Sequence, residues 1–423
     1  MQGWEKLPLG RAGVVLLDCD HKTPEAVLNG RPYIGIPQMT SGRIDFSTGR
    51  QISEADFVTW TRKTKYQHND VVLSRRTNPG VTAIDDTRTE FALGQNLVLL
   101  RANGKRVEPA FLRWLIRTPE WWEQIAKYIN VGAVFSSLRC RDVPHFELTI
   151  PPLPEQRAIA ATLGALDDKI ELNRRMNETL EAMARALFRD WFVDFGPIRA
   201  KMAGTTPYLS DDIWSLFPDR LDPEGKPEGW KYRSVYAFAN VVYGAPFASK
   251  MFNSESKGHP LIRIRDLADH APGIFTEELH TKGHLIAPGD IVVGMDGEFR
   301  LHVWKGQPAW LNQRVCHFEP LEGIPLAFLV EALKKPLEFF ERGKVGTTVI
   351  HLGKGDIDTF QLLHPGDQVL LAFSMATSSL IEATVRNELE SRTLAQTRDL
   401  LLPCLMSGAL RIAEAERMLE EVA

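Results

Sequence analysis

Three motifs in the first half of the chain return in the second half, about 215–228 residues later. They are RPYIGIPQM (31–39) with HPLIRIRDL (259–267), AFLRWLI (110–116) with AFLVEAL (327–333), and VGAVFSSLRCRDV (131–143) with VGTTVIHLGKGDI (345–357). Solenoid repeats have periods of about 20–50 residues, so this longer period indicates a duplicated domain. Two similar surfaces on one chain suit a target that has two separated parts, of which DNA read across a pseudo-twofold axis is the leading example.

Composition places the chain among soluble globular proteins. Its 423 residues are enough for two or three domains with their own cores, and 44% hydrophobic with 25% charged residues is ordinary. We find no apolar run of about 18 residues and no secretory leader, so we expect no membrane span and a cytoplasmic protein. The four cysteines are scattered, which disfavours a zinc site and a disulfide framework.

The charge is unevenly distributed along the chain. The net charge of −4 is not typical of a nucleic-acid-binding protein. Residues 1–150, however, hold 20 Lys and Arg against 16 Asp and Glu, a net of +4, and residues 228–365 hold 15 against 16, a net of −1. Because phosphate contacts supply most of the affinity for DNA, we expect weak binding by this chain alone and partners that add positive surface.

Each copy of the repeat is predicted to be an α+β unit. Turn residues precede β-rich stretches at 70–76 and 290–296, and a second matched pair follows at 94–101 and 312–320. A helix with the AFL motif comes next in each copy. Strands and helices mix without regular βαβ alternation, which is typical of an α+β fold.

A long helix is predicted after each α+β unit. The first begins near PLPEQR (152–157), and the second follows HPGDQ (364–368) and is expected to end at Pro403. In both, one set of positions steps alternately by four and three residues, which is the heptad pattern of a coiled coil. The seam positions are Ile159, Leu163, Leu166, Ile170, Asn173, Asn177, Leu180 and Leu187 in the first helix, and Leu380, Asn387, Leu394 and Leu401 in the second.

The heptads have two explanations. Each helix can pack on its own domain only, or the two can pack on each other. Two matched heptad helices, each after one copy of the repeat, favour pairing, in which a polar seam residue such as Asn173 would fix the register.

No catalytic site can be assembled from the sequence. The chain lacks a P-loop, a G-x-S-x-G elbow, an H-E-x-x-H pair and the Asn/Asp-Pro-Pro-aromatic motif of DNA amino-methyltransferases. The segment PDRLDPEGK (218–226) superficially resembles a PD-(D/E)xK nuclease signature, but its carboxylates are too close together for strands of one sheet, so we expect a solvated turn there. Lone histidines such as His68, His317 and His351 are expected to be surface or core residues. We therefore expect a non-catalytic chain without a metal site.

Three segments resemble the specificity subunits of Type I restriction–modification systems. Residues 151–195, beginning PPLPEQRAIAATLG, are similar to the central conserved region of that family. LFPDRLDPEGKPEGW (216–230) is similar to the entry into its second recognition domain, and TLAQTRDLLLPCLMSGALRI (393–412) to its distal conserved region. The resemblance covers essentially the whole chain. The second helix departs from it, with Pro365-Gly366-Asp367-Gln368 in place of a full PEQ motif.

The resemblance implies an architecture and a set of partners. Two similar α+β target-recognition domains are expected, separated by two long helices that form an antiparallel coiled coil, with an internal pseudo-twofold. Each domain would read one half of a bipartite target in double-stranded DNA. The helical pair would set the gap between the half-sites and dock two modification (methyltransferase) subunits, and restriction (translocase) subunits would complete the complex. S-adenosylmethionine, ATP and Mg²⁺ are expected on these partners, and no cofactor on this chain.

This architecture divides the chain into five expected ranges. They are a first target-recognition domain at 1–152, the first coiled-coil helix at 153–200, a linker at 201–227, a second target-recognition domain at 228–364, and the second helix with a C-terminal tail at 365–423.

Candidate DNA contacts are the Arg, Lys, Asn and Gln side chains near the matched strands, because these residue types read base edges and bind phosphates. They are Lys63, Lys65, Arg75, Arg76, Asn78, Gln95 and Asn96 in the first domain, and Arg263, Arg265, Arg300, Asn312, Gln313 and Arg314 in the second. Gln95 and Gln313 are matched across the repeat, which leaves a scaffold role and a DNA contact both open. Arg75 and Arg76 stand where the other copy has GMD (294–296), and such unmatched residues are better candidates for specificity.

Two other functions stay open at this level. One is a duplicated, non-catalytic scaffold that binds protein only, and the other is a hidden nuclease or methyltransferase activity.

Overall fold

The computed structural model describes residues 3–20, 22–131, 136–343, 350–415 and 417. The chain divides into two compact units, which we call unit 1 (Met1–Asp168 with Leu394–Ala423) and unit 2 (Lys169–Thr393). Both borders fall inside long helices, so each unit contains a part of each helix. The matched glycines Gly132 and Gly346 lie outside the described residues.

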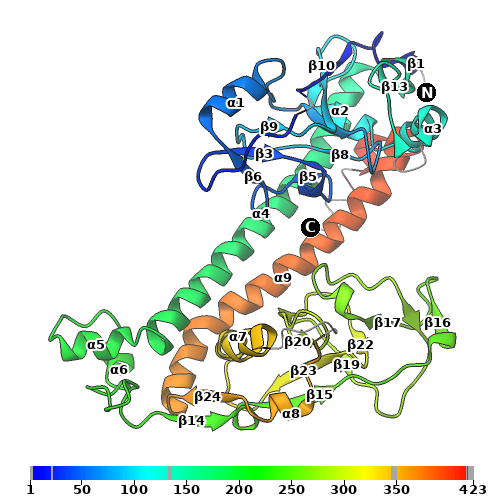
Figure 1. The fold of residues 1–423 in the computed structure, drawn as a ribbon. Helices are drawn as coiled ribbons and strands as arrows, with labels where there is room; N and C mark the ends of the chain where they lie inside the picture. Colours follow the sequence, from blue (N-terminus) through cyan, green and yellow to red (C-terminus); the bar gives the residue numbers. More distant parts are fainter. Residues whose placement is uncertain (1–2, 21, 132–135, 344–349, 416, 418–423) are drawn as a thin grey trace. The chain divides into compact units, whose positions relative to one another are not determined.

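An antiparallel four-stranded sheet forms the centre of unit 1, with the strand order β2-β10-β7-β8 (Figure 1). Its strands are β2 (Val14–Leu17), β7 (Val71–Ser74), β8 (Thr82–Ala83) and β10 (Leu97–Ala102). Side chains alternate along a strand. In β10, Val98 and Leu100 therefore enter one core, while Leu97 and Leu99 enter another on the opposite face. The strand is buried on both sides, which explains its almost continuous apolar sequence.

Smaller sheets and three helices complete the α+β part of unit 1. Strand β3 pairs in parallel with β9 and antiparallel with β6, and the other pairs are β1 with β13, β4 with β5 and β11 with β12. The strand bounds are β1 Glu5–Pro8, β3 Arg31–Ile34, β4 Met39–Thr40, β5 Arg43–Ile44, β6 Arg50–Ile52, β9 Ala92–Leu93, β11 Asn130–Val131, β12 Ser136–Ser137 and β13 Glu147–Ile150. The helices are α1 (Glu54–Thr61), α2 (Pro109–Leu115) and α3 (Pro119–Tyr128), with 3-10 turns η1 (Ile36–Gln38) and η2 (Val143–His145).

Unit 2 repeats this topology. Its central sheet has the order β15-β23-β20-β21, β17 pairs in parallel with β22, and β14 pairs with β24. The strand bounds are β14 Lys231–Ser234, β15 Ala239–Tyr243, β16 Phe252–Asn253, β17 His259–Ile262, β18 Phe275–Thr276, β19 Leu285–Ile286, β20 Ile291–Gly294, β21 Leu301–Val303, β22 Ala309–Leu311, β23 Val315–Pro320 and β24 Gln361–His364. The helices are α7 (Leu326–Gly343) and α8 (Lys354–Ile357), with 3-10 turns η3 (Val235–Ala237), η4 (Ser249–Met251) and η5 (Ile264–Asp266).

The duplication extends to the residue level. The parallel pair Ile34↔Leu93 of unit 1 corresponds to Ile262↔Leu311 of unit 2, as the sequence repeat requires. The 3-10 turn after that strand closes in the same way in both copies. The Gly35 N–H donates to the Gln38 side chain, and the Arg263 N–H donates to Asp266. The predicted α+β class and the internal duplication are confirmed.

The two long helices are α4 (Leu153–Phe192) and α9 (Asp367–Met406). Helix α4 is followed by the short helices α5 (Gly196–Met202) and α6 (Asp211–Trp214), so the predicted linker is partly folded. The expectation that the second helix ends at Pro403 is wrong, because α9 continues to Met406. A proline this near the C-terminus removes only one backbone hydrogen bond, and the helix stops where Gly408 adopts a positive φ of 68°.

Within each unit the two helices contact each other and run antiparallel. In unit 2, Asn177 accepts a hydrogen bond from Asn387 at 2.9 Å and donates to the Thr384 carbonyl at 3.1 Å. Asn173 donates to the Glu390 side chain at 2.7 Å. Most seam positions are buried or partly buried, and Asn173 and Asn177 are among the buried ones. Asn177 and Asn387 can pair in this way only in one register, which is the effect of polar seam residues in coiled coils.

By length and composition, α9 is the one described helix that could cross a membrane. The core helix of a soluble protein passes the same test. Phe373, Leu401 and Leu405 of α9 are buried in the unit cores, and its buried Asn387 pairs with α4. We therefore interpret α9 as a core helix.

A buried ionic cluster fastens the helices to the α+β part of unit 1. The side chain of Asp167 on α4 is 4% exposed and accepts hydrogen bonds from Arg113 of α2 and, at 2.6 Å, from Arg398 of α9. Arg43 of β5 and Asp86 of the segment between β8 and β9 extend the cluster. Because several buried cations share this carboxylate, its loss would leave positive charges without compensation.

We predict that Asp167→Ala destabilises the chain by about 3–5 kcal/mol, the usual cost of breaking a buried ion pair. Asp168→Ala is the matched control, because Asp168 is the next residue of α4 and is exposed. It should change stability by less than about 0.5 kcal/mol. Guanidinium denaturation of the full chain measures both, and equal effects would contradict the assigned role of Asp167.

Candidate nucleic-acid interface

Most predicted contact residues of unit 1 lie at one edge of its central sheet. Strand β10 is antiparallel to β2 and β7, with Leu17 opposite Leu99 and Ser74 opposite Leu97. The ends of β2 and β7 and the start of β10 therefore meet at the same edge. Five candidates follow β7 or precede β10 there, namely Arg75, Arg76, Asn78, Gln95 and Asn96.

Backbone hydrogen bonds join three segments at this edge, and we call their meeting point the unit 1 junction. The Arg75 N–H donates to the Asn96 carbonyl at 3.0 Å, and the Leu138 N–H donates to the Arg75 carbonyl at 2.8 Å. Arg76 forms an isolated antiparallel bridge with Ser137. The junction holds the backbone of Arg76 while its side chain stays exposed.

Thr77 marks a strained turn beside Arg76. Its φ of 64° lies in the left-handed region, which β-branched residues rarely adopt. Gly297 occupies the corresponding position in unit 2, with a φ of 76°. Such strain costs about 1–3 kcal/mol and tends to occur at functional sites, so the turn after β7 is a strong candidate for ligand contact.

Lys63 and Lys65 are less available than the residues of the junction. Lys63 pairs with Asp20 at 2.7 Å, and this hydrogen bond lowers the pKa of Asp20. Lys65 pairs with Glu90, whose pKa is lowered by hydrogen bonds from Lys65 and Arg31. Both lysines would have to exchange a carboxylate for a phosphate, which weakens their case as DNA contacts.

Unit 2 has the corresponding edge at the end of β20 and the start of β23, where Gly294 faces Val315. Asn312, Gln313 and Arg314 immediately precede β23 there. The Met295 N–H donates to the Arg314 carbonyl at 3.0 Å, and the Leu352 N–H donates to the Met295 carbonyl at 2.8 Å. These are the same two bonds as in unit 1, and we call this meeting point the unit 2 junction.

The other candidates of unit 2 lie nearby or on an adjacent turn. Arg263 precedes η5, and its hydrogen bonds to Asp266 raise its pKa, so it is largely engaged within its own turn. Arg265 is exposed on η5. Arg300 lies on the turn between β20 and β21 with 68% of its side chain exposed, and pairs with Glu298 at 2.9 Å.

Sequence reasoning missed two residues of the unit 2 junction. Asp296 lies between Arg314, whose Nε is 3.4 Å from Oδ2, and His351, whose Nδ1 is 2.6 Å from Oδ1. His351 was interpreted as an isolated histidine. The signal for both lay in the repeat, which aligns Asp296 with Arg76 and His351 with Ser137.

The chain is similar in sequence to known proteins. Residues 19–182 match the family model described as Type I restriction modification DNA specificity domain. The chain is 25% identical to the Type I restriction enzyme HindI specificity subunit of Haemophilus influenzae, an alignment that covers 85% of this chain and 90% of that one. The chain is thus similar to Type I specificity subunits over most of its length.

Two further proteins show the same similarity. The EcoBI specificity subunit of Escherichia coli is 31% identical over 188 residues, which are 43% of this chain and 40% of the relative. The crystal structure of the Type I restriction–modification S subunit from M. genitalium has a TM-score of 0.52 and 16% identity, and covers 95% of this chain and 96% of that one. The latter similarity concerns the fold.

The nuclease-like segment of this chain is a structural turn. Lys226 pairs with Glu224 at 2.7 Å and also with Asp222, whose carboxylate accepts the Glu224 and Lys226 N–H groups. Arg220 pairs with Glu228. Among the described residues, no group of three or more His, Cys, Asp and Glu is placed to hold a metal ion.

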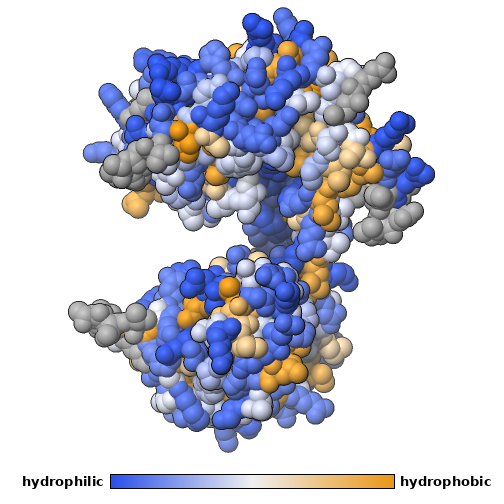
Figure 2. Space-filling model, turned by 90° about the vertical axis from the view of Figure 1, so that its right-hand side faces the viewer, coloured by the Kyte–Doolittle hydropathy of each residue, from blue (hydrophilic) through white to orange (hydrophobic). Residues whose placement is uncertain are grey.

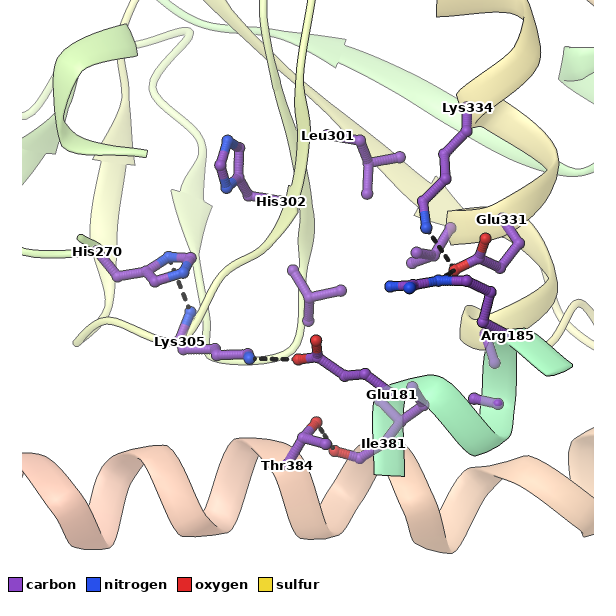
Figure 3. Close-up of a pocket in the computed structure, with 14 residues that line it drawn as sticks. Glu181, Arg185, His270, Leu301, His302, Lys305, Glu331, Lys334, Ile381 and Thr384 are labelled. Atoms are coloured by element: carbon purple, nitrogen blue, oxygen red, sulfur yellow. Dashed lines mark hydrogen bonds and ion pairs between the residues drawn. The ribbon is translucent and has the colours of Figure 1, made fainter. Parts of the chain in front are cut away.

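One cavity of unit 2, about 270 Å³, lies among α4, α7, α9 and β21 (Figure 3). Lys305 reaches Glu181 at 2.7 Å, while Arg185 and Lys334 converge on Glu331. Each of these cations therefore has a carboxylate partner. Burial lowers the pKa of the adjacent His270 to about 3, so this histidine is neutral near pH 7.

The repeat explains why the cavity exists. Its lining residues Ala184, Lys305, Val330 and Ile381 occupy the positions of Arg398, Asp86, Arg113 and Asp167 in unit 1. At three of these positions the apolar residues Ala184, Val330 and Ile381 stand where unit 1 has charged residues of its ionic cluster, so space is left unfilled. We interpret the cavity as a consequence of this divergence.

Proposed function

We propose that this chain is a Type I specificity subunit that reads a bipartite DNA sequence, one half with each junction, within a restriction–modification complex. One observation carries the proposal. The two junctions share their backbone hydrogen bonds and a matched glutamine (Gln95 and Gln313), but they differ in the other polar side chains that they display. Unit 1 displays Arg76, Asn96 and Ser137, where unit 2 displays Asp296, Arg314 and His351. A conserved frame with different hydrogen-bonding groups is what reading two different half-sites requires.

A duplicated scaffold that binds protein only is the weaker alternative. Such a surface would be rich in apolar or aromatic anchors. The exposed side chains at the junctions are instead Arg, Asn and Gln, which are the residue types that bind base edges and phosphates.

The modification subunits are proposed to dock on an exposed face of α4. Leu172, Met176 and Met183 are 52%, 41% and 49% exposed. Their spacing of four and seven residues places them on one face of the helix, beside the seam and away from Glu181, which contacts the α+β part of unit 2. Apolar side chains also reach the surface along the helical segments in Figure 2. Exposed apolar residues in a row are typical of a protein-docking site.

The remaining features of the complex are proposed from the family. The chain itself has no catalytic role, and S-adenosylmethionine, ATP and Mg²⁺ belong to the modification and restriction subunits. The helical pair sets the gap between the half-sites, and the assembly works in the cytoplasm. The five ranges predicted from the sequence stand as our proposal for the domain borders.

Sequence-specific DNA binding is tested by competition in a gel-shift assay. The chain is combined with its modification subunits and a labelled library of random DNA, and bound molecules are sequenced over several rounds. We expect two short conserved blocks separated by a gap of fixed length and variable sequence. Binding of DNA without any base preference, or no binding at all, would contradict the proposal.

Removing one heptad from both helices should shorten the gap in the DNA target. Deletion of residues 174–180 and 382–388 removes facing segments and keeps the seam in phase, since seven residues are close to two turns. Met183 then takes the place of Met176, so the docking face keeps an apolar residue there. Each helix shortens by about 10 Å. At about 3.4 Å per base pair, the selected gap should fall by about three base pairs while both blocks keep their sequence. An unchanged gap would refute the role of the helices as a spacer.

Met176→Asp should prevent assembly with the modification subunits, because it introduces a charge into the apolar face. Met202→Asp is the matched control, since Met202 is 57% exposed on α5, outside that face. Copurification with the modification subunits should be lost for the first variant and retained for the second. Equal copurification of both would show that this face of α4 is not the docking site.

A further inference from the structure

We propose that Arg314 reads a guanine in the half-site of unit 2 and that Asp296, held by His351, orients its guanidinium group. This inference rests on the proposed function and specifies one base pair of the target. It starts from the three-residue cluster at the unit 2 junction.

The geometry of the cluster leaves part of the guanidinium group available. Nε of Arg314 faces the Asp296 carboxylate at 3.4 Å, and Nη1 lies 3.5 Å from Nδ1 of His351. Nη2 has no partner among the described residues. The Arg314 side chain is 56% exposed, whereas Asp296 is 26% exposed. The arginine is thus anchored on its inner side and open on its outer side.

Two features of the backbone keep the cluster in place. Arg314 and Asp296 lie on the two segments that the bond from the Met295 N–H to the Arg314 carbonyl joins. His351 bridges to Asp296, and the Gly297 N–H donates to the Ile350 carbonyl at 2.9 Å. A preorganised arginine loses less side-chain entropy on binding than a free one, so more of its hydrogen-bond energy contributes to discrimination.

The chemistry of the cluster selects guanine. A guanidinium group forms two parallel hydrogen bonds to O6 and N7 of guanine, which is the commonest specific contact in the major groove. Adenine offers a donor in place of O6 and would meet the arginine with a repulsive contact. Asp296 does not read cytosine in this arrangement, because Arg314 and His351 each engage one of its two oxygens.

The corresponding positions in unit 1 cannot form this cluster. Arg76 replaces Asp296, Asn96 replaces Arg314 and Ser137 replaces His351. The unit 1 junction therefore has a cation, and not a carboxylate, at the position of Asp296. The guanine contact is therefore assigned to the half-site of unit 2 only.

The test uses the complex of this chain with its modification subunits and the same DNA selection. In Arg314→Lys, the charge remains but the planar fork is lost. We expect the preference for G·C at one base pair of one half-site to fall about tenfold to hundredfold, with the other half-site unchanged. Asp296→Asn should weaken preference at the same base pair while total DNA binding stays equal or rises, because a negative charge has been removed. A merely structural role of Asp296 would lower binding to all sequences.

Arg76→Lys is the matched control at the equivalent junction and should affect the opposite half-site only. Three outcomes would overturn the inference. In the first, Arg314→Lys keeps every base preference. In the second, it loses preference at a base pair other than G·C, and in the third, it loses preference equally in both half-sites. If the complex that contains the unsubstituted chain selects no DNA sequence at all, the proposed function itself fails. If it selects two blocks that Arg314→Lys leaves intact, only the guanine contact fails.

Discussion

The pairing of α4 with α9 is the interaction on which both units depend. In each unit, the core is completed by the helix that belongs to the opposite half of the repeat. Leu401 and Leu405 of α9 enter the core of unit 1, and Trp191 and Phe192 of α4 enter the core of unit 2. The buried amides between the helices fix the register in which this happens. A shift in that register would therefore disturb two cores as well as the helical pair.

The two units show how a duplicated frame acquires different chemistry. The strand orders of their central sheets and their junction bonds are the same, because these are backbone properties that many sequences can satisfy. The side chains at equivalent positions differ both at the exposed edge and in the interior. At the exposed edge, Arg76 of unit 1 corresponds to Asp296 of unit 2. In the interior, Asp167 of unit 1 corresponds to Ile381 of unit 2. Divergence at the edge alters what can be bound, whereas divergence inside alters how tightly the unit is packed.

Much of the candidate site could be predicted from the sequence, because strand ends and repeat alignment point to the same segments. Arg75, Arg76, Asn96 and Arg314 lie at the junctions as their positions beside the matched strands suggested. Lys63 and Arg263 show the limit of this reasoning, since each is engaged by a nearby carboxylate. Side-chain pairing depends on approach in three dimensions, and residue type alone does not reveal it.

The sequence by itself determined the duplication, the α+β class and the two long helices, because repeat spacing and hydrophobic periodicity are local properties of the chain. Which charged side chains pair with one another depends on the tertiary structure. Asp296 stands 18 residues before Arg314 and 55 before His351, and Asp167 is 231 residues from Arg398. Such contacts form only when the sheet edge and the helical pair bring distant segments together, and no periodicity in the sequence records that approach.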